Sequence, residues 1–316
     1  MGATRPRVVC LDTVMMDVVV TVEQLPARGG DALASRRVVS AGGGFNLMSA
    51  ARRQGVDALY VGQLGVGHFA DRARESLAAE GVTVALGARG ELDLGVCIVI
   101  VDSLGERTFV TSPGAELTMT AEELAGVTVG PGDVVYLSGY DVVYPELAPV
   151  VAPWLGTLRE DVVVAFDPGP RVGDIDPDVL SGVLARTTWL LLNVAEAHEL
   201  SGYHVARDAA QALRATTRCA VVVVRDGERG SVGVDANGTV VAPGFSVDVV
   251  DTNGAGDVHN AVLMGELLRG RPLEEALVRA NAAAALSIGD VGPATGPTSA
   301  RVDEFLERPS WGSGGD

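Results

Sequence analysis

The sequence contains 316 residues, of which 47% are hydrophobic and 21% are charged, and its net charge at pH 7 is −17. This composition is typical of a globular chain with one large α/β domain and an insert, or with two domains, and it excludes wholesale disorder. The acidic excess disfavours nucleic acid and anionic membrane surfaces as main partners. All 24 basic residues are arginine, which excludes mechanisms that need a catalytic lysine.

Short apolar runs alternate with helix-forming segments along most of the chain. In chain order, the predicted strands are 7–11, 58–61, 134–137, 162–166, 189–192 and 220–224. The predicted helices are 44–54, 69–80, 145–158, 195–201 and 206–216. Most of the apolar runs are continuous rather than alternating, which is typical of strands covered on both faces. The pattern therefore predicts a mainly parallel sheet with helices on both faces.

Two segments, 17–39 and 94–110, break this alternation, because they contain strand-like runs and turns with no helix between them. We expect them to form a small β insert that acts as a lid over a cleft. The chain start has no apolar signal core, and no apolar run approaches the ~18 residues of a membrane span, so we expect a cytoplasmic protein. The last residues, 308–316, are rich in Pro, Gly and Ser and are predicted to be disordered.

The strongest chemical signal is the sequence Asp-Thr-Asn-Gly-Ala-Gly-Asp at 251–257, between a predicted strand at 246–250 and a predicted helix at 258–268. Small residues at a strand-to-helix turn let backbone N–H groups converge on an anion, and the helix dipole adds to the attraction. Asp257, at the start of the helix, can accept a proton from a substrate hydroxyl. The alternative is an aspartate that only caps the helix after a glycine turn.

The motif at 251–257 resembles the signature of the ribokinase-like, PfkB-type carbohydrate kinases. Further motifs that resemble those of the family stand in the same order at 41–46, 193–196, 225–230 and 281–297. The resemblance implies a three-layer α/β/α domain with a mainly parallel central sheet and a small β-sheet lid. The catalytic domain would comprise 1–12, 40–92 and 112–307, and the lid insert 13–39 and 93–111, with the disordered tail at 308–316.

The resemblance also implies an ATP-dependent kinase that transfers the γ-phosphoryl group to a hydroxyl of a sugar or sugar-like molecule. Asp257 would be the general base, and the amides of Gly254, Ala255 and Gly256 would stabilise the transferring group. The implied substrate-binding residues are Asp17, Gly42, Gly43 and Asn46, and the implied nucleotide-binding residues are Asn193, Arg225, Gly227, Gly230 and Asn281.

Metal ions and a second subunit are implied in the same way. Glu196 would hold Mg²⁺ through water. A monovalent cation, with K⁺ as the candidate, would lie near Asp251, Asn253, Ser287, Asp290, Gly292 and Gly296. The partners would be a small-molecule sugar and ATP, and a homodimer would form through the lid.

Several residues also have simpler interpretations. Asn193 and Glu196 have the spacing of a helix capping box, Arg225 could be a solvated loop residue that replaces a threonine of the family, and Asn281 could be an exposed helix residue. His259 stands where the family usually has an aromatic, and we expect it to fill space. A dinucleotide-binding fingerprint at 65–70 lacks the acidic residue that should follow it at 82–86.

The sequence does not identify the substrate. A nucleoside kinase and a non-catalytic metabolite-binding regulator of the same fold are the alternatives. Asp12, Met15 and Gly43 differ from what a ribose-specific enzyme would carry, which disfavours ribose. The segments expected at the sugar, 12–17 and 42–46, contain no arginine, so we expect a neutral sugar. Arg36, Arg37 and Arg107 weaken that expectation, because they lie on the insert.

Overall fold

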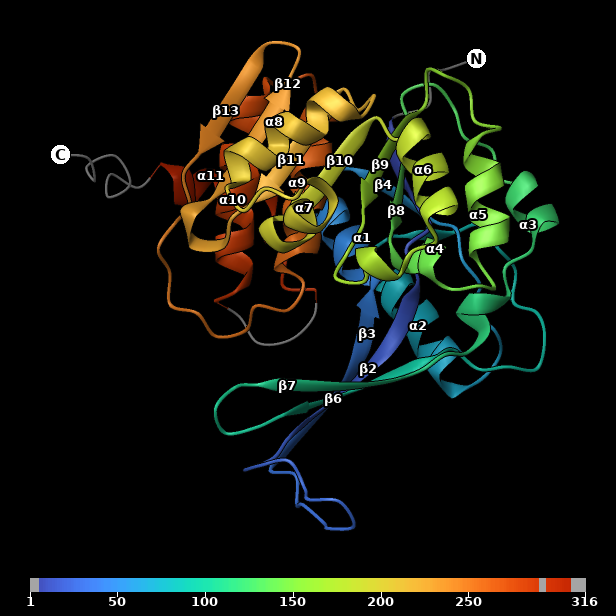
Figure 1. Ribbon diagram of the computed structural model, residues 1–316. Coiled ribbons are helices and arrows are strands. Elements are labelled where there is room, and N and C mark those ends of the chain that lie inside the picture. The colour runs from blue at the N-terminus through green and yellow to red at the C-terminus, as the bar shows by residue number, and fades with distance from the viewer. Residues whose placement is uncertain (1–5, 290–293, 308–316) are drawn as a thin grey trace.

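A large mixed sheet forms the centre of the molecule (Figure 1). The structure is a computed structural model that describes residues 6–289 and 294–307. Within these residues the sheet order is β13 (Gly238–Ala242), β12 (Ser231–Asp235), β11 (Val221–Arg225), β10 (Trp189–Asn193), β9 (Val163–Asp167), β8 (Val134–Ser138), β1 (Arg7–Cys10), β4 (Asp57–Tyr60) and β5 (Thr83–Val84). Strands β11 to β5 pair in parallel, and β12 and β13 add an antiparallel edge.

Helices cover both faces of this sheet. One face packs against α1 (Gly44–Arg53), α2 (His68–Ala79), α9 (Ala255–Leu268), α10 (Leu273–Ser287) and α11 (Ser299–Leu306). The other packs against α3 (Ala121–Ala125), α4 (Tyr140–Val143), α5 (Ala148–Leu155), α6 (Pro177–Arg186), α7 (Val194–Ser201) and α8 (Ala206–Thr216). Alternate residues of each central strand enter opposite cores: Val221 and Val223 enter the first, and Val222 and Val224 the second. This two-sided burial explains the continuous apolar runs.

The parallel strands bring polar residues together at one edge of the sheet. Ser138 ends β8 and pairs in register with Asp167 at the end of β9. Asn193 ends β10 and pairs with Arg225 at the end of β11. Since all of these strands run in the same direction, their carboxyl ends meet where ligands usually bind in α/β sheets.

A second, four-stranded sheet projects from this domain (Figure 1). Among the described residues its order is β3 (Arg36–Gly43), β2 (Val14–Thr21), β6 (Val96–Val101) and β7 (Arg107–Ser112). β2 and β6 are parallel, and the other pairs are antiparallel, including the predicted hairpin of β6 and β7. We call this sheet the lid. The predicted α/β fold with a small β-sheet lid is thus confirmed.

Two sequence predictions need correction near the 251–257 motif. The predicted strand at 246–250 does not form; this segment is irregular, and Val249 and Val250 are exposed. The N–H of Val250 bonds instead to the carbonyl of Ile288 at the end of α10, at 2.8 Å. The helix predicted from 258 starts three residues earlier, so that Asp257 lies in the first turn of α9. The predicted disordered tail, 308–316, lies outside the described residues.

No helix in the described ranges combines the length and the apolar character that a membrane crossing requires.

Candidate active site

Asp257 lies in the first turn of α9, as expected from the glycine motif. Gly254 precedes the helix in the left-handed conformation, with φ of 77°. A helix leaves its first N–H groups without intrahelical acceptors, and its dipole makes this end positive. The predicted catalytic segment therefore combines a carboxylate with backbone donors that can hold an anion.

The side-chain amide of Asn46, on α1, donates to Oδ2 of Asp257 at 3.4 Å. The Oδ1 atom of Asn46 accepts from the N–H of Ala294 at 3.0 Å. Desolvation, and then the charges of Asp12 and Asp167, raise the pKa of Asp257 to about 8, against the lowering effect of Asn46 and Arg225. A carboxyl with a pKa near neutrality suits general-base catalysis.

The predicted substrate residues Asp17, Gly42 and Gly43 lie together where the lid joins the large domain. Asp17 is buried on β2, and burial raises its pKa to about 6. A Cβ on Gly42 would lie 2.1 Å from Oδ2 of Asp17, so only glycine leaves room for this carboxylate. Gly43 has a φ of 61°, and a Cβ there would lie 2.2 Å from the carbonyl oxygen of Thr13. At both positions, therefore, the local structure requires glycine.

Asp12 adds a buried carboxylate that sequence reasoning treated only as a departure from the family. It accepts a hydrogen bond from Oγ of Ser138 at 2.6 Å. Burial and the neighbouring Asp141 raise the pKa of Asp12 well above its usual range. Asp141 is itself buried, and its pKa is raised to about 7. The signal in the sequence was an acidic residue directly after the strand at 7–11.

Asn193 and Glu196 form the capping box that their spacing allowed. Asn193 precedes α7 and its Oδ1 accepts from the N–H of Glu196 at 2.9 Å, while Oε2 of Glu196 accepts from the N–H of Asn193 at 2.8 Å. Burial and the charge of Asp167 raise the pKa of Glu196 to about 7, although Arg225 lowers it. Both residues line a cavity of about 360 Å³, so the cap leaves them at an accessible site.

Arg225 is a partly buried ion-pair partner rather than a solvated loop residue. Its guanidinium lies 3.0 Å from Oδ2 of Asp167 and 3.8 Å from Oε2 of Glu196. It also donates to Asn260, whose amide donates to Asp167 at 2.7 Å. Burial alone would lower the pKa of Arg225, but the two carboxylates raise it. The guanidinium lies 3.7 Å from where a Cβ of Gly256 would stand, so its charge is next to the glycine turn.

Sequence reasoning missed Asp167 and Asn260. Asp167 had a usable signal, because an acidic residue directly after a predicted parallel strand lies at the ligand-binding edge. For Asn260 the sequence offered no signal beyond its position about one helical turn after the 251–257 motif.

The other predicted nucleotide residues are Gly227, Gly230 and Asn281. Gly227 and Gly230 shape the turn between β11 and β12, with φ of 58° and 93°. Asn281 is buried on α10, and its amide donates to the carbonyls of Ala242 and Pro243 at 3.1 and 3.0 Å. Thus Asn281 is not an exposed helix residue, and it ties α10 to the end of β13.

His259 is buried against Asn281, with Nε2 at 3.1 Å from Oδ1 of that residue. Burial, and then the charge of Arg225, lower the pKa of His259 to about 3. The imidazole is therefore neutral and packs inside the domain, in line with its expected space-filling role.

Four of the residues proposed for a monovalent cation make other contacts in the described part of the chain. Asp251 forms an ion pair with Arg107 of the lid. The carbonyl of Gly296 accepts from Arg53 at 3.0 Å. Ser287 is buried, and its hydroxyl bonds to the carbonyl of Ala284 at 2.7 Å. The N–H of Asn253 bonds to Oδ1 of Asp251 at 2.8 Å. The two other residues of the set, Asp290 and Gly292, lie outside the described residues.

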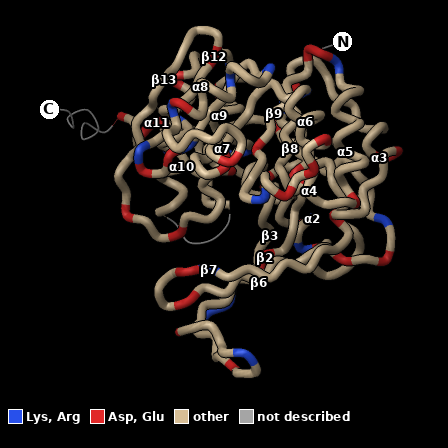
Figure 2. The backbone as a smooth tube through the Cα atoms, in the orientation of Figure 1, with Lys and Arg blue, Asp and Glu red and all other residues tan. Residues whose placement is uncertain are grey.

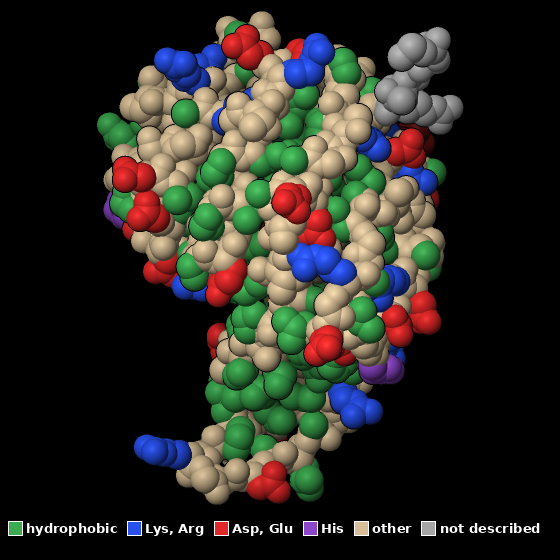
Figure 3. Space-filling view, turned by 90° about the vertical axis from the view of Figure 1, so that its right-hand side faces the viewer, with side chains coloured by type: hydrophobic (Ala, Val, Ile, Leu, Met, Phe, Trp, Pro, Cys, Tyr) green, Lys and Arg blue, Asp and Glu red, His purple; other side chains and the backbone are tan. Residues whose placement is uncertain are grey.

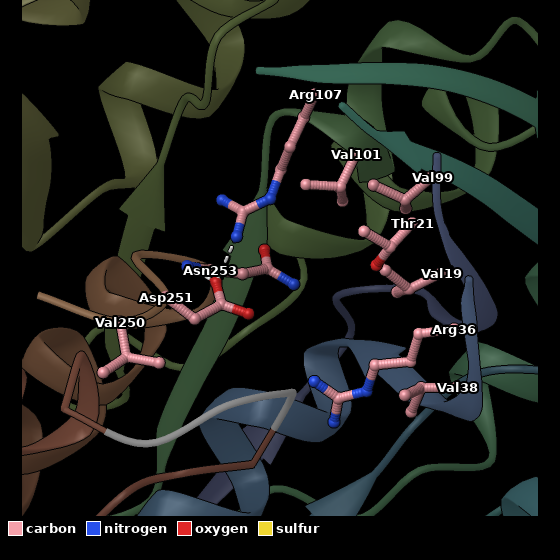
Figure 4. A pocket seen from close by; sticks show the side chains of 10 residues that line it. All are labelled: Val19, Thr21, Arg36, Val38, Val99, Val101, Arg107, Val250, Asp251 and Asn253. Atoms are coloured by element: carbon pink, nitrogen blue, oxygen red, sulfur yellow. Dashed lines mark hydrogen bonds and ion pairs between the residues drawn. The ribbon is translucent and has the colours of Figure 1, made fainter. Parts of the chain in front are cut away.

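A cavity of about 200 Å³ lies between the lid and residues 250–253 (Figure 4). Its apolar wall comes from the lid strands. The lining residues are Val19, Thr21, Arg36, Val38, Val99, Val101, Arg107, Val250, Asp251 and Asn253. The ion pair of Arg107 with Asp251 spans this cavity and joins the lid to the loop before α9.

A family model described as pfkB family carbohydrate kinase matches residues 5–300. The chain is 34% identical over 306 residues to the uncharacterized sugar kinase YegV of Escherichia coli, covering 93% of this chain and 92% of that protein. It is 31% identical over 305 residues to an ATP-dependent ribose-1-phosphate kinase of Halopiger xanaduensis, covering 95% and 98%.

Solved structures show the same fold. The ribokinase of Thermotoga maritima aligns with a TM-score of 0.80 at 24% identity, covering 96% of this chain and all of that one. A nucleoside kinase of Methanocaldococcus jannaschii aligns with a TM-score of 0.80 at 19% identity, covering 97% and 99%.

Proposed function

Because the chain belongs to the PfkB family of carbohydrate kinases, we propose that it transfers the γ-phosphoryl group of ATP to a hydroxyl of a sugar-like substrate. The observation that carries this proposal is Asp257, which stands at the positive end of α9 with Asn46 on its carboxylate. A carboxylate beside the backbone donors of this helix end can serve as the base that a kinase needs and that a non-catalytic member does not.

In the proposed reaction Asp257 accepts the proton of the attacked hydroxyl. The hydroxyl oxygen forms a bond to the γ-phosphorus while the bond between that phosphorus and the bridging β–γ oxygen breaks, and ADP leaves with the electron pair. The N–H groups of Gly254, Ala255 and Gly256 stabilise negative charge on the transferring group. Asp17 and Asn46 orient the substrate through its hydroxyls.

We place the nucleotide on the side of Asn193, Arg225, Gly227, Gly230 and Asn281. The cavity lined by Asn193 and Glu196 supports this placement. Glu196 and Asp167 supply two carboxylates against the single guanidinium of Arg225, and this acidic excess fits Mg²⁺ held by Glu196 through water. When bound, Mg²⁺ neutralises charge on the phosphates.

We also propose a homodimer that forms through the lid. The lid face turned away from the cavity carries Val18 and Val20 on β2, Ile98 and Ile100 on β6, and Val110 on β7. Ile98 and Val110 are 39% and 54% exposed. Hydrophobic side chains gather on the part of the molecule that the lid forms (Figure 3), and such a surface is typical of an interface. The cytoplasmic location remains a prediction.

A screen of acceptors tests the proposed function. Purified protein with MgATP would be assayed for ADP formation with free pentoses and hexoses, sugar monophosphates, sugar acids and nucleosides. The name of the Halopiger relative adds ribose 1-phosphate to the panel. We expect at least one sugar-like acceptor to stimulate ADP formation, and Asp257→Asn to remove the stimulation. Preference for nucleosides would favour the alternative kinase, and no stimulation by any acceptor would favour a non-catalytic regulator.

A further inference from the structure

The cavity under the lid holds an excess of positive charge. Its lining contains the guanidinium groups of Arg36 and Arg107 and the single carboxylate of Asp251. The protein as a whole has a net charge of −17, and acidic residues lie along much of the backbone trace (Figure 2). A cationic cavity is therefore a local exception in an acidic molecule, and it attracts anions.

The two arginines differ in their partners. Arg107 forms an ion pair with Asp251 and also lies 3.4 Å from the hydroxyl of Thr252. Arg36 makes no ion pair or side-chain hydrogen bond with any residue in the described part of the chain. Both side chains extend from the lid toward Asp251 and Asn253 (Figure 4). Arg36 is exposed, so its donors are open to the cavity and to solvent.

Strand register relates this cavity to the expected sugar. Arg36 pairs with Thr21 on β2, Thr21 pairs with Val101 on β6, and Val101 pairs with Arg107 on β7, so the four residues form one row across the lid. Asp17 lies four residues before Thr21 and therefore on the same face, roughly 13 Å along the strand.

We propose that Arg36 and Arg107 bind an anionic group of the sugar substrate, a phosphate or a carboxylate, while Asp17 holds its hydroxyls. This inference rests on the proposed kinase function and names its substrate class. It reverses the expectation of a neutral sugar, which depended on the lack of arginine in 12–17 and 42–46. The structure brings arginine to the site from the far ends of β3 and β7. Two guanidinium groups match an anion through charge-assisted hydrogen bonds.

The test compares Arg36→Gln with Arg37→Gln. Arg37 is the next residue on β3, so its side chain points to the opposite face of the lid, and it is a matched control. Each protein would be assayed with ribose, ribose 5-phosphate, ribose 1-phosphate, fructose 6-phosphate and gluconate as acceptors. We expect the wild type to prefer an anionic sugar by kcat/KM. Arg36→Gln should lower kcat/KM for that sugar at least tenfold, mainly through KM, and change it less than twofold for ribose. The phosphate and gluconate arms distinguish the two anions.

Titration calorimetry with the same sugars, in the absence of ATP, separates this inference from the proposed function. Failure of every acceptor to yield ADP would reject the kinase, but binding of an anionic sugar by wild type and its loss in Arg36→Gln would still support the anion site. Preference for ribose over its phosphates and gluconate would overturn the inference. Equal behaviour of Arg36→Gln and Arg37→Gln, or no binding of any anionic probe, would also overturn it.

Discussion

The amide of Asn46 contacts the carboxylate of Asp257 at 3.4 Å, although 211 positions separate them in the chain. Asn46 is buried on α1, and a Cβ on Gly254 would lie 3.4 Å from its amide. The contact thus fixes the glycine turn of α9 against the helix that follows the lid. It joins the expected phosphoryl site to the expected sugar site through one side chain.

Replacement of Asp257 by Asn should remove phosphoryl transfer and leave nucleotide binding intact. The amide has the size of the carboxylate but cannot take the proton of a hydroxyl, and a general base typically contributes about 10²–10⁴-fold to the rate. Steady-state kinetics with the best acceptor and nucleotide titration would measure the two effects. A variant that keeps more than about a tenth of the wild-type kcat would contradict the assignment.

The free energy of unfolding of the unliganded protein should fall as the pH rises from about 6.5 to 8. Asp257, with a pKa of about 8, and Glu196 and Asp141, with pKa values of about 7, bind protons in the folded state at pH values where the unfolded chain has lost them. Their stabilising contribution is complete below their unfolded pKa values of about 4, falls as the pH rises, and is lost once the pH passes their folded values of about 7 and 8, so the window from 6.5 to 8 is the last part of this loss. His259 acts in the opposite sense only below about 6.5, because its folded pKa is about 3.

Urea unfolding at several pH values would measure this slope. Asp257→Asn should flatten it by up to about 1.4 kcal/mol per pH unit, the value for one proton. Asp248→Asn, at an exposed aspartate, is the control. An identical slope in Asp257→Asn and the wild type would show that this carboxyl does not carry the effect.

Glu196→Gln should weaken the response to Mg²⁺ far more than it weakens sugar affinity. Glutamine also completes a capping box, so the variant should unfold close to the wild-type temperature. Glu199→Gln, on the rim of the same cavity, is the matched control. Initial rates over a range of Mg²⁺ concentrations would measure this response. An unchanged Mg²⁺ dependence would show that Glu196 only caps the helix.

Gly42→Ala should raise the KM for the sugar at least tenfold while nucleotide affinity stays within twofold. The new methyl group would stand 2.1 Å from Oδ2 of Asp17 and must displace this carboxylate. Gly182→Ala is the control, because a Cβ at that helical position meets no atom within 4 Å. If the two variants have the same KM for the sugar, Asp17 is not in contact with it.

Sequence patterns predicted most strands of the central sheet, because a strand that is buried on both faces is a continuous run of apolar residues. The continuous run at 220–224 became β11, and the hairpin at 96–110 became β6 and β7. The strand predicted at 246–250 was wrong because an apolar run alone does not supply a partner strand. Its apolar residues favour a strand, but a strand needs a neighbouring edge, and this segment pairs with the end of α10 instead.

Contacts between segments that are distant in the chain could not be predicted from the sequence. The ion pair of Arg225 with Asp167 depends on the position of β9 and β11 on either side of β10, and the pair of Arg107 with Asp251 depends on how the lid faces α9. No local pattern encodes either placement. This is why the sequence left open whether Arg225 is a solvated loop residue, and why it did not predict the pair of Arg107 with Asp251.

The direct passage from β3 into α1 has a mechanical consequence. Gly43 ends the lid strand β3 and Gly44 begins the helix that carries Asn46, so any change in the direction of β3 at this junction would act directly on that helix. In the proposed kinase, a sugar bound under the lid would act through this junction on the contact of Asn46 with Asp257, so substrate binding would be coupled to the alignment of the proposed base.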